Sequence, residues 1–165
     1  MTKQSKPVFL FYKYEKSVLI EIDARFKYNF FKPSLFNLKL HEGSLIIYIF
    51  WYIFTFGRYK IFYIFENQKM VHFSNVLPKI FKYSFMRKED IQIANCYTDP
   101  LFRGNQLYPF ALSIIAEEYA DNTVWVGSRS DNSASLSGIK KAGYILISKV
   151  YKSMFLGIYR LSKDE

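Results

Sequence analysis

The chain is short of cysteine and histidine and has no cluster of basic residues, and each shortage excludes a class of protein. Cys96 is the only cysteine among 165 residues, which rules out a disulfide framework. Two histidines beside one cysteine offer too few ligands for a structural zinc site, so we expect no bound metal. Lysine and arginine are scattered along the chain, which argues against nucleic-acid binding. The sequence also contains no internal repeat and no low-complexity segment.

The chain also lacks an apolar run long enough to cross a membrane. The longest candidate, Leu45–Phe56, spans about 12 residues, well short of the roughly 20 that a bilayer requires, and Arg58 and Lys60 follow it. Met1–Lys6 is polar, and Phe9–Tyr14 is too short for the core of a signal peptide. We therefore expect a cytoplasmic protein with Leu45–Phe56 as a buried helix or strand. The alternative is that this segment inserts at a membrane surface, which would place the protein at the inner membrane face.

What the chain does contain is typical of one folded domain. Half of the residues are hydrophobic and 20% are aromatic, which excludes disorder, and a chain of this length buries about two-thirds of its unfolded surface. Lysine and arginine number 23 against 14 acidic residues, and the net charge of +9 favours anionic partners such as phosphorylated cofactors, nucleotide-linked substrates or acidic membranes.

One stretch, Ile91–Leu112, combines a strand, a tight turn and a helix. Ile91–Thr98 is apolar or β-prone, which predicts a strand. Beyond the turn, apolar residues recur at helical spacing, and Pro109 is tolerated only in a first turn, so we expect the helix to start near Leu107 or Tyr108. Such a connection directs backbone N–H groups and the helix dipole at one spot, which favours a phosphate. An ordinary strand–turn–helix connection with no ligand is the alternative.

Two segments are similar to the motifs of a known protein family, and they occur in the same order and at a similar spacing. They are Tyr97–Tyr108, with its Arg103-Gly104 pair, and Asn132–Tyr144. The first resembles the acetyl-CoA-binding segment of GNAT-type N-acetyltransferases, and the second resembles the Asn…Gly-aromatic element of that family. Together with their surroundings, they cover roughly residues 59–160. The resemblance implies a single-domain α/β (α+β) fold with a central mixed, mostly antiparallel sheet flanked by helices. Residues 59–161 would then form the cofactor-binding core and residues 1–58 the variable acceptor side.

Local patterns predict the elements around these segments. We expect a hairpin of Lys60–Phe65 and Met70–Val76, then a short strand Thr123–Val126 parallel to Ile91–Thr98. A helix should begin at a cap among Ser130, Asp131 and Asn132, run to Ala142 and end before Gly143. Tyr144–Val150 and Met154–Leu161 should then form a final hairpin. Before residue 59 the pattern is weaker, and it favours a strand at Ser17–Ile22, a short helix at Pro33–Leu40 and a turn at His41–Ser44.

By resemblance, the cofactor would be held mainly by backbone groups. N–H groups of residues 103–108 would hold the diphosphate of acetyl-CoA, the backbone of Cys96 and Thr98 would pair with the pantetheine arm, and the backbone near Tyr97 would meet the thioester carbonyl. The implied cofactor-binding residues are Cys96, Tyr97, Thr98, Arg103, Gly104, Asn105, Gln106, Leu107, Tyr108, Asn132 and Ser135.

The sequence departs from the family pattern at two of these positions. Gln106 and Tyr108 stand where the family usually has small residues, mostly glycine. We expect Gln106 to keep an ordinary helical or β backbone conformation, because a positive φ is costly for a residue with a side chain. Tyr108 should fill space near the phosphates, which would tighten the site without abolishing it.

The acceptor side is less well defined. His72 is the most attractive general base, because its ordinary pKa of about 6.5 suits proton removal from an ammonium group. Its alternative role is that of a hydrogen-bonded histidine in a half-buried sheet, and Tyr97 and Asp99 are alternative catalytic residues. Cys96 has no histidine or carboxylate neighbour in sequence that would support a covalent role. By resemblance, the acid that protonates the leaving thiolate would stand at Ile139, so the usual acid is missing.

The sequence around Val71-His72 and around Asp90-Ile91 resembles that of a branch of GNAT proteins associated with surface polysaccharide biosynthesis. This implies an acetyl-CoA-dependent transfer to a primary amine by direct attack in a ternary complex, with an amino sugar on a nucleotide carrier as acceptor. A catalytically silent module that binds CoA, and a membrane-surface module that uses Leu45–Phe56, are the alternatives.

Overall fold

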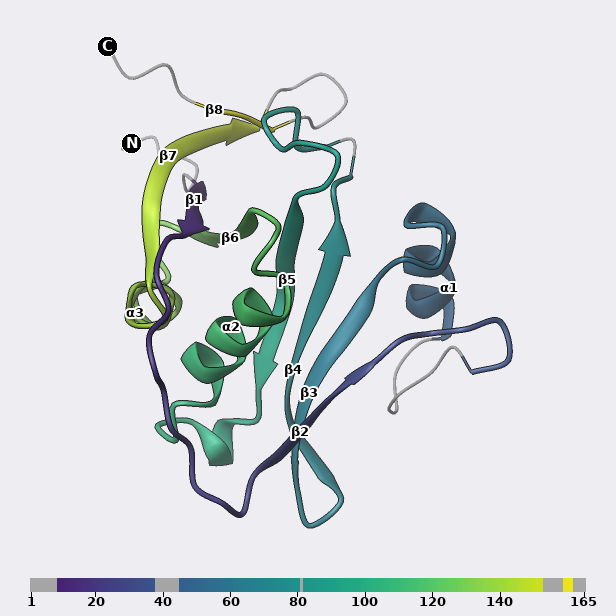
Figure 1. Ribbon diagram of the computed structural model, residues 1–165, viewed down its shortest axis with the longest axis vertical. Coiled ribbons are helices and arrows are strands. Elements are labelled where there is room, and N and C mark those ends of the chain that lie inside the picture. The colour runs from purple at the N-terminus through teal and green to yellow at the C-terminus, as the bar shows by residue number, and fades with distance from the viewer. Residues whose placement is uncertain (1–8, 38–44, 81, 153–158, 162–165) are drawn as a thin grey trace, which may run out of the picture.

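The computed structural model describes residues 9–37, 45–80, 82–152 and 159–161, and it shows one sheet with helices on both faces. Its eight strands lie in the order β2-β3-β4-β5-β6-β1-β7-β8 (Figure 1). All neighbouring strands are antiparallel except β5 and β6. The strands are β1 (Phe9–Tyr14), β2 (Lys27–Phe31), β3 (Lys60–Glu66), β4 (Lys69–Pro78), β5 (Ile91–Thr98), β6 (Val124–Arg129), β7 (Tyr144–Lys152) and β8 (Tyr159–Leu161). This is the mixed, mostly antiparallel sheet that the resemblance predicts.

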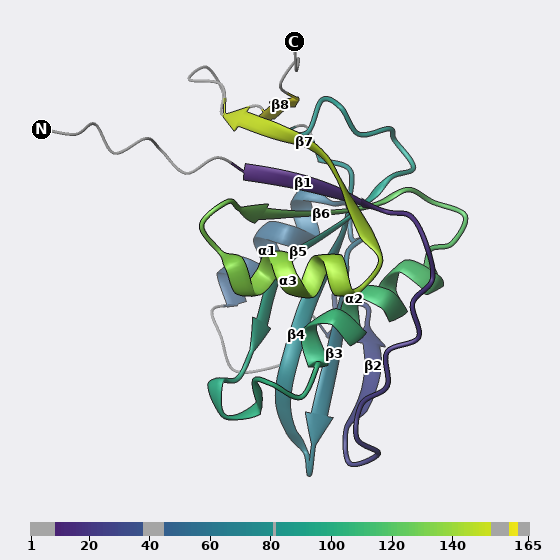
Figure 2. The ribbon, with the colours of Figure 1, turned by 90° about the vertical axis from the view of Figure 1, so that its left-hand side faces the viewer.

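Three helices cover the sheet, and they are divided between its faces. Helices α2 (Leu107–Glu118) and α3 (Ser133–Lys141) lie on one face, and α1 (Leu45–Phe54) lies on the other (Figure 2). The main core lies under α2, where Ala111, Leu112 and Ile115 are fully buried against Phe62 and Ile93 of the sheet. Burial of these side chains is the largest contribution to the stability of the domain.

The elements after residue 59 agree with the sequence patterns. β3 and β4 form the expected hairpin, whose turn residues Asn67 and Gln68 both have positive φ, as a tight hairpin turn requires. Asn132 caps α3 and Gly143, at φ +85°, follows its end, so both predicted boundaries are confirmed. β7 pairs with β8 as predicted, although residues 153–158 lie outside the described part of the chain.

The N-terminal predictions were mostly wrong. Residues 17–22 form no strand, and Phe9–Tyr14 forms β1 instead, which pairs with both β6 and β7. Residues 33–37 make a tight turn closed by a bridge between Ser34 and Asn37 in place of a helix. The predicted continuation of that helix over residues 38–40 and the turn at residues 41–44 lie outside the described residues. Local pattern failed here because the partners of β1 are more than 100 residues away in sequence.

Helix α1 is mostly exposed, contrary to the expectation of a buried element. Tyr48 is its one buried residue, and Tyr59 donates a hydrogen bond to the Tyr48 carbonyl over 3.3 Å, which ties the helix to β3. Most of the other side chains are open to solvent; Ile46, for example, is 76% exposed. The exposed residues on one stripe of the helix, which we call the α1 stripe, are Leu45, Ile46, Ile49, Phe50, Ile53 and Phe54. Among the described residues, no helix is both long and apolar enough to span a bilayer.

Candidate active site

The site is built around a split in the sheet between its two parallel strands. β5 and β6 are paired only from Ile91 to Ile93, opposite Val124 to Val126. β1 pairs with the other edge of β6, and among the described strands none pairs with the β6 side of residues 94–98. A bulge next to Asn95, which has φ +49°, accompanies the divergence of β5. The end of β5 therefore presents an unpaired strand edge.

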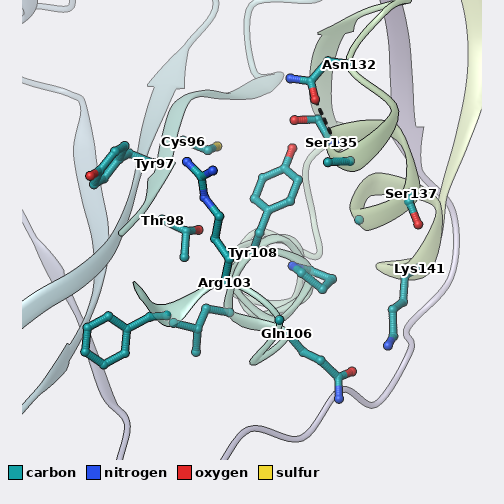
Figure 3. Close-up of a pocket in the computed structure, with 16 residues that line it drawn as sticks. Cys96, Tyr97, Thr98, Arg103, Gln106, Tyr108, Asn132, Ser135, Ser137 and Lys141 are labelled. Carbon is teal, nitrogen blue, oxygen red and sulfur yellow. Dashed lines mark hydrogen bonds between the residues drawn. The ribbon is translucent and has the colours of Figure 1, made fainter. Parts of the chain in front are cut away.

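A cavity of about 630 Å³ opens at this split, between the end of β5, the start of α2 and one face of α3 (Figure 3). Its lining brings together most of the residues that the resemblance implies. The lining residues are Cys96, Tyr97, Thr98, Phe102, Arg103, Gly104, Gln106, Leu107, Tyr108, Pro109, Asn132, Ala134, Ser135, Ser137, Gly138 and Lys141. Of the eleven predicted cofactor-binding residues, Asn105 is the one that does not line the cavity.

The opening turn of α2 faces this cavity. A short 3₁₀ turn, Pro100–Phe102, leads from β5, and α2 begins at Leu107 with Pro109 in its first turn, as predicted. No side chain caps the start of α2, so its first N–H groups are available to a ligand. The Arg103 N–H is different, because it donates to the Pro100 carbonyl over 3.4 Å. Of the backbone N–H donors that we expected from residues 103–108, the one of Arg103 is therefore already engaged, and the donors for a ligand begin at Gly104.

Gln106 does not have the ordinary backbone conformation that we expected. It lies in the left-handed region at φ 59° and ψ 13°, and Gly104 is also at positive φ, +88°. The loop therefore keeps a shape that favours glycine at both positions and imposes strain on Gln106. The prediction failed because the turn requires a left-handed backbone at position 106, and this requirement outweighed the preference of glutamine for negative φ.

Salt bridges and ring contacts attach this loop to the neighbouring β3–β4 turn. Lys69 Nζ lies 2.8 Å from Asp99 Oδ2 and also packs over the ring of Phe102. Hydrogen bonds from Lys69 and from the Leu101 N–H hold the pKa of Asp99 below its usual value. Asp99 is thereby engaged in shaping the loop, and it does not line the cavity.

Tyr108 stands between β5 and α3, with its hydroxyl directed at the start of α3 (Figure 3). The hydroxyl faces Ser135, and burial raises the pKa of Tyr108 well above its usual value. The ring packs directly against Gly138, where an added Cβ would lie 2.6 Å from Tyr108 Cδ1. Tyr108 thus narrows the gap between β5 and α3 and leaves the remaining cavity open.

Asn132 and Ser135 form the opposite wall. The Asn132 side-chain oxygen accepts a hydrogen bond from the Ser135 N–H over 3.1 Å, which caps α3. Lys141, in the last turn of the same helix, also lines the cavity and supplies positive charge together with Arg103. These two cations favour an anionic ligand.

The positions of His72 and Cys96 do not favour catalysis. His72 is fully buried, and its Nδ1 and Nε2 atoms are hydrogen-bonded to Thr98 Oγ1 at 2.7 Å and Ser74 Oγ at 2.9 Å. Burial lowers the pKa of His72 to about 3. It does not line the cavity, so this geometry favours the alternative role of a hydrogen-bonded sheet histidine over that of a general base. Burial also raises the pKa of Cys96 to about 11, which makes it a poor nucleophile.

Neither Ile139 nor the nearby Tyr144 supplies an acid to the cavity. Ile139 is fully buried in the core, away from the cavity. Tyr144 is also buried, and its hydroxyl donates to the Leu112 carbonyl over 3.1 Å. Within the described chain, no three histidine, cysteine, aspartate or glutamate residues come together as a metal site.

Sequence reasoning missed part of the α3 wall, namely Ala134, Ser137, Gly138 and Lys141. The signal was present, because these residues recur three and four positions apart and three of them are small. A helix stripe of small residues that follows the cap could have been identified as the side that faces a ligand.

Comparisons with known proteins give similarity of structure but not of sequence. The chain matches no model of a known protein family and no curated protein sequence. A GNAT-family acetyltransferase from Colwellia psychrerythraea aligns with 86% of this chain and 53% of its own, with a TM-score of 0.61 and 14% identity. A putative GNAT-family acetyltransferase from Novosphingobium aromaticivorans aligns with 86% of this chain and 60% of its own, with a TM-score of 0.53 and 10% identity.

A third solved structure has a length closer to that of this chain. The ribosomal-protein-S18-alanine N-acetyltransferase from Escherichia coli aligns over 81% of this chain and 88% of its own, with a TM-score of 0.53 and 15% identity. The chain spans only 53–60% of the length of four other matched structures. The fold of this chain is therefore that of the GNAT acetyltransferases.

Proposed function

We propose that this protein binds acetyl-CoA in the cavity beside β5 and transfers the acetyl group to a primary amine by direct attack in a ternary complex. The observation that carries the proposal is the split between β5 and β6, which lies next to the uncapped start of α2. The split leaves a free strand edge on β5, and the start of α2 offers backbone N–H donors. Together they suit a ligand with an amide-containing arm and a diphosphate.

The residues present fit such a ligand. N–H groups from Gly104 to Tyr108 would hold the diphosphate, and Arg103 and Lys141 would add charge. The unpaired backbone of Cys96 and Thr98 would bind the pantetheine arm as an added strand, with Ser135 on the other side. The backbone at Tyr97 would then lie beside the thioester carbonyl, where donors help most as negative charge develops.

The site offers few side chains that could take up the proton released in the reaction. The described cavity lining contains no histidine, aspartate or glutamate, and His72 is buried behind Thr98. We propose that water takes the proton from the attacking amine and that Tyr97 acts through its backbone. The rate should then rise with pH until the acceptor amine itself is deprotonated.

Charge reversal at the phosphate end tests the cofactor part of the proposal. Arg103→Glu and Lys141→Glu should each weaken acetyl-CoA binding by about ten- to a hundredfold in titration calorimetry, because each removes a charge-assisted contact. Lys140→Glu is the matched control, since Lys140 is the neighbouring exposed residue in the same helix turn and does not line the cavity. Equal affinities in all three variants would contradict the site.

Thiol release across a panel of amines tests the enzyme part. CoA binding without thiol release from any amine, nucleotide-linked amino sugars included, would favour the alternative of a catalytically silent module. An amino sugar on a nucleotide carrier, as in surface polysaccharide biosynthesis, is our first choice of acceptor for this panel.

Contact with a membrane surface is a second candidate function, favoured by the α1 stripe. Seven large apolar residues, the six of the α1 stripe and Ile47, are exposed on a helix of 10 residues that carries no charge. With a net charge of +9 on the chain, such a surface suits an anionic bilayer. Binding of this kind would be compatible with acetyl transfer, because α1 lies on the face of the sheet opposite α2.

A further inference from the structure

We infer that the amine acceptor carries its amino group on a ring, and that this ring binds against a row of aromatic side chains on the sheet. This inference rests on the proposed acetyl transfer. The row consists of Tyr63, Phe73 and Tyr97, on β3, β4 and β5, and we call it the aromatic row.

The three residues lie directly opposite one another in the sheet. Tyr63 is the register partner of Phe73, and Phe73 is the register partner of Tyr97. Neighbouring strands are about 4.8 Å apart, so the three side chains form a continuous strip roughly 10 Å long. The rings of Phe73 and Tyr97 have centroids 5.7 Å apart and are inclined by only 32°, and Phe65 extends the strip with its ring stacked 6.0 Å from that of Tyr63.

The aromatic row lies on the face that α1 covers only in part. α1 packs over the other end of the same strands, where Ile61 and Leu77 are buried with Tyr48. Towards the β3–β4 turn the surface opens, so that Tyr63 is half-buried and Tyr97 is 48% exposed. A strip of rings that remains accessible to solvent beside a folded core can accept an apolar ligand surface.

The strip is continuous with the cavity through Tyr97. This residue lines the cavity, and its side chain points away from Tyr108, whereas Cys96 and Thr98 belong to the cofactor side (Figure 3). A cofactor on the α2 side leaves the opposite face of the sheet for the attacking amine. An amine that approaches the thioester from that face passes over the ring of Tyr97.

The chemistry of this surface selects the kind of amine. On the described part of this face, the exposed or half-buried side chains of β3, β4 and β5 near the row are mostly aromatic, apolar or amide, Met70 beside Phe65 included. On β2, Asn29 stands opposite Tyr63 and Lys27 opposite Phe65. Linear polyamines and lysine side chains are usually recognised by carboxylates, and the nearby Glu66 is already paired with Arg25 at 3.2 Å. Aromatic faces instead bind the apolar face of a ring or stack on a flat one.

Two amines of equal carbon number isolate the effect of the ring. Cyclohexylamine should be acetylated at least about tenfold more efficiently, in kcat/KM, than n-hexylamine, as measured by thiol release. Glucosamine and aniline, which both carry the amino group directly on the ring, then distinguish a pyranose from an aromatic ring. Equal use of the cyclic and the linear amine would overturn the inference.

Variants of Tyr63 connect the preference to the row. Tyr63→Leu should reduce the preference for cyclohexylamine by at least about threefold, and Tyr63→Phe, which keeps the ring, should retain it. Tyr28→Leu is the control, because Tyr28 is an exposed tyrosine on the opposite face of the sheet. An unchanged preference in Tyr63→Leu would overturn the inference.

A binding measurement separates this inference from the proposed function. Saturation-transfer NMR with glucosamine should show ring protons in contact with the wild-type protein, and the effect should weaken in Tyr63→Leu and not in Tyr28→Leu. If acetyl-CoA fails to bind while this signal persists, the acetyl-transfer proposal fails and the aromatic row remains a ring-binding surface. If acetyl-CoA binds and the ring signal is absent, the present inference fails alone.

Discussion

The two faces of the sheet differ in how their covering helices are held. On the α2–α3 face, side chains interlock closely, so that Gly138 accepts the ring of Tyr108 and His72 is enclosed between two hydroxyls. On the α1 face, one helix rests on a few buried residues and leaves large apolar and aromatic side chains exposed. We infer that the first face is built to shape a cofactor pocket and the second to meet variable partners. Substitutions of the interlocked side chains on the first face should therefore change stability, whereas substitutions of the exposed side chains on the second should change binding with little effect on stability.

The largest effect is expected from the acid titration of His72. The unfolded chain takes up this proton near the usual pKa of about 6.5, whereas the folded chain takes it up only near pH 3, so the unfolded state binds more protons between these values. Stability from this group is thus complete above pH 6.5 and is lost as the pH falls towards 3, by up to about 5 kcal/mol. Urea unfolding across this range should show a steeper loss for wild type than for His72→Asn. Parallel curves would contradict the buried, neutral histidine.

The next effect concerns the contact between Gly138 and Tyr108. Gly138→Ala should destabilise the protein by about 1–3 kcal/mol, because the new methyl group would overlap the tyrosine ring. In a Tyr108→Ala background the same substitution should cost little. A double-mutant cycle by urea unfolding measures this coupling, and additive effects would show that the two residues do not share the space.

A smaller effect, of opposite sign, is expected at Gln106. Gln106→Gly should stabilise the protein by roughly 0.5–1 kcal/mol, because glycine relieves the left-handed conformation at a partial entropic cost. Asn105→Gly, one position earlier in the same loop, is the comparison; Asn105 has no positive φ and should gain nothing. Thermal unfolding of both variants checks the difference, and a loss of stability in Gln106→Gly would argue against the strained turn.

The smallest change in stability is expected on the α1 stripe. Ile46→Glu and Ile53→Glu should alter unfolding free energy by less than about 0.5 kcal/mol, because both side chains are already exposed. They should nevertheless reduce co-sedimentation with phosphatidylglycerol vesicles. Trp51 is less suitable for this test, since it is half-buried against the core beneath α1. Vesicle binding that persists in both variants would exclude the α1 stripe as a membrane contact.

The part of the molecule that could be predicted from sequence is the part specified by local signals. Pro109 fixed the start of α2, and Asn132 and Gly143 fixed the ends of α3, because caps and stops act within a few residues. The same locality identified the single strand–turn–helix unit that borders the cavity. The resemblance contributed the order of these units and the expectation of a mixed, mostly antiparallel sheet.

The remaining features depend on distant contacts or on geometry that overrides preference. β1 was missed because its strand partners β6 and β7 lie at the other end of the sequence. For His72, sequence left open the roles of general base and hydrogen-bonded sheet residue, because its hydrogen bond to Thr98 depends on the register between β4 and β5. The aromatic row depends on the same registers, so no periodicity within one strand could have shown that its three members align.

The most direct test of the central claim is a titration of ¹⁵N-labelled protein with acetyl-CoA, followed by amide chemical shifts. We predict that the largest shifts fall on two groups of amides at once, residues 104–108 at the start of α2 and residues 96–98 at the free edge of β5. Binding with shifts confined elsewhere, or no binding at millimolar ligand, would contradict the assignment of this cavity as an acetyl-CoA site.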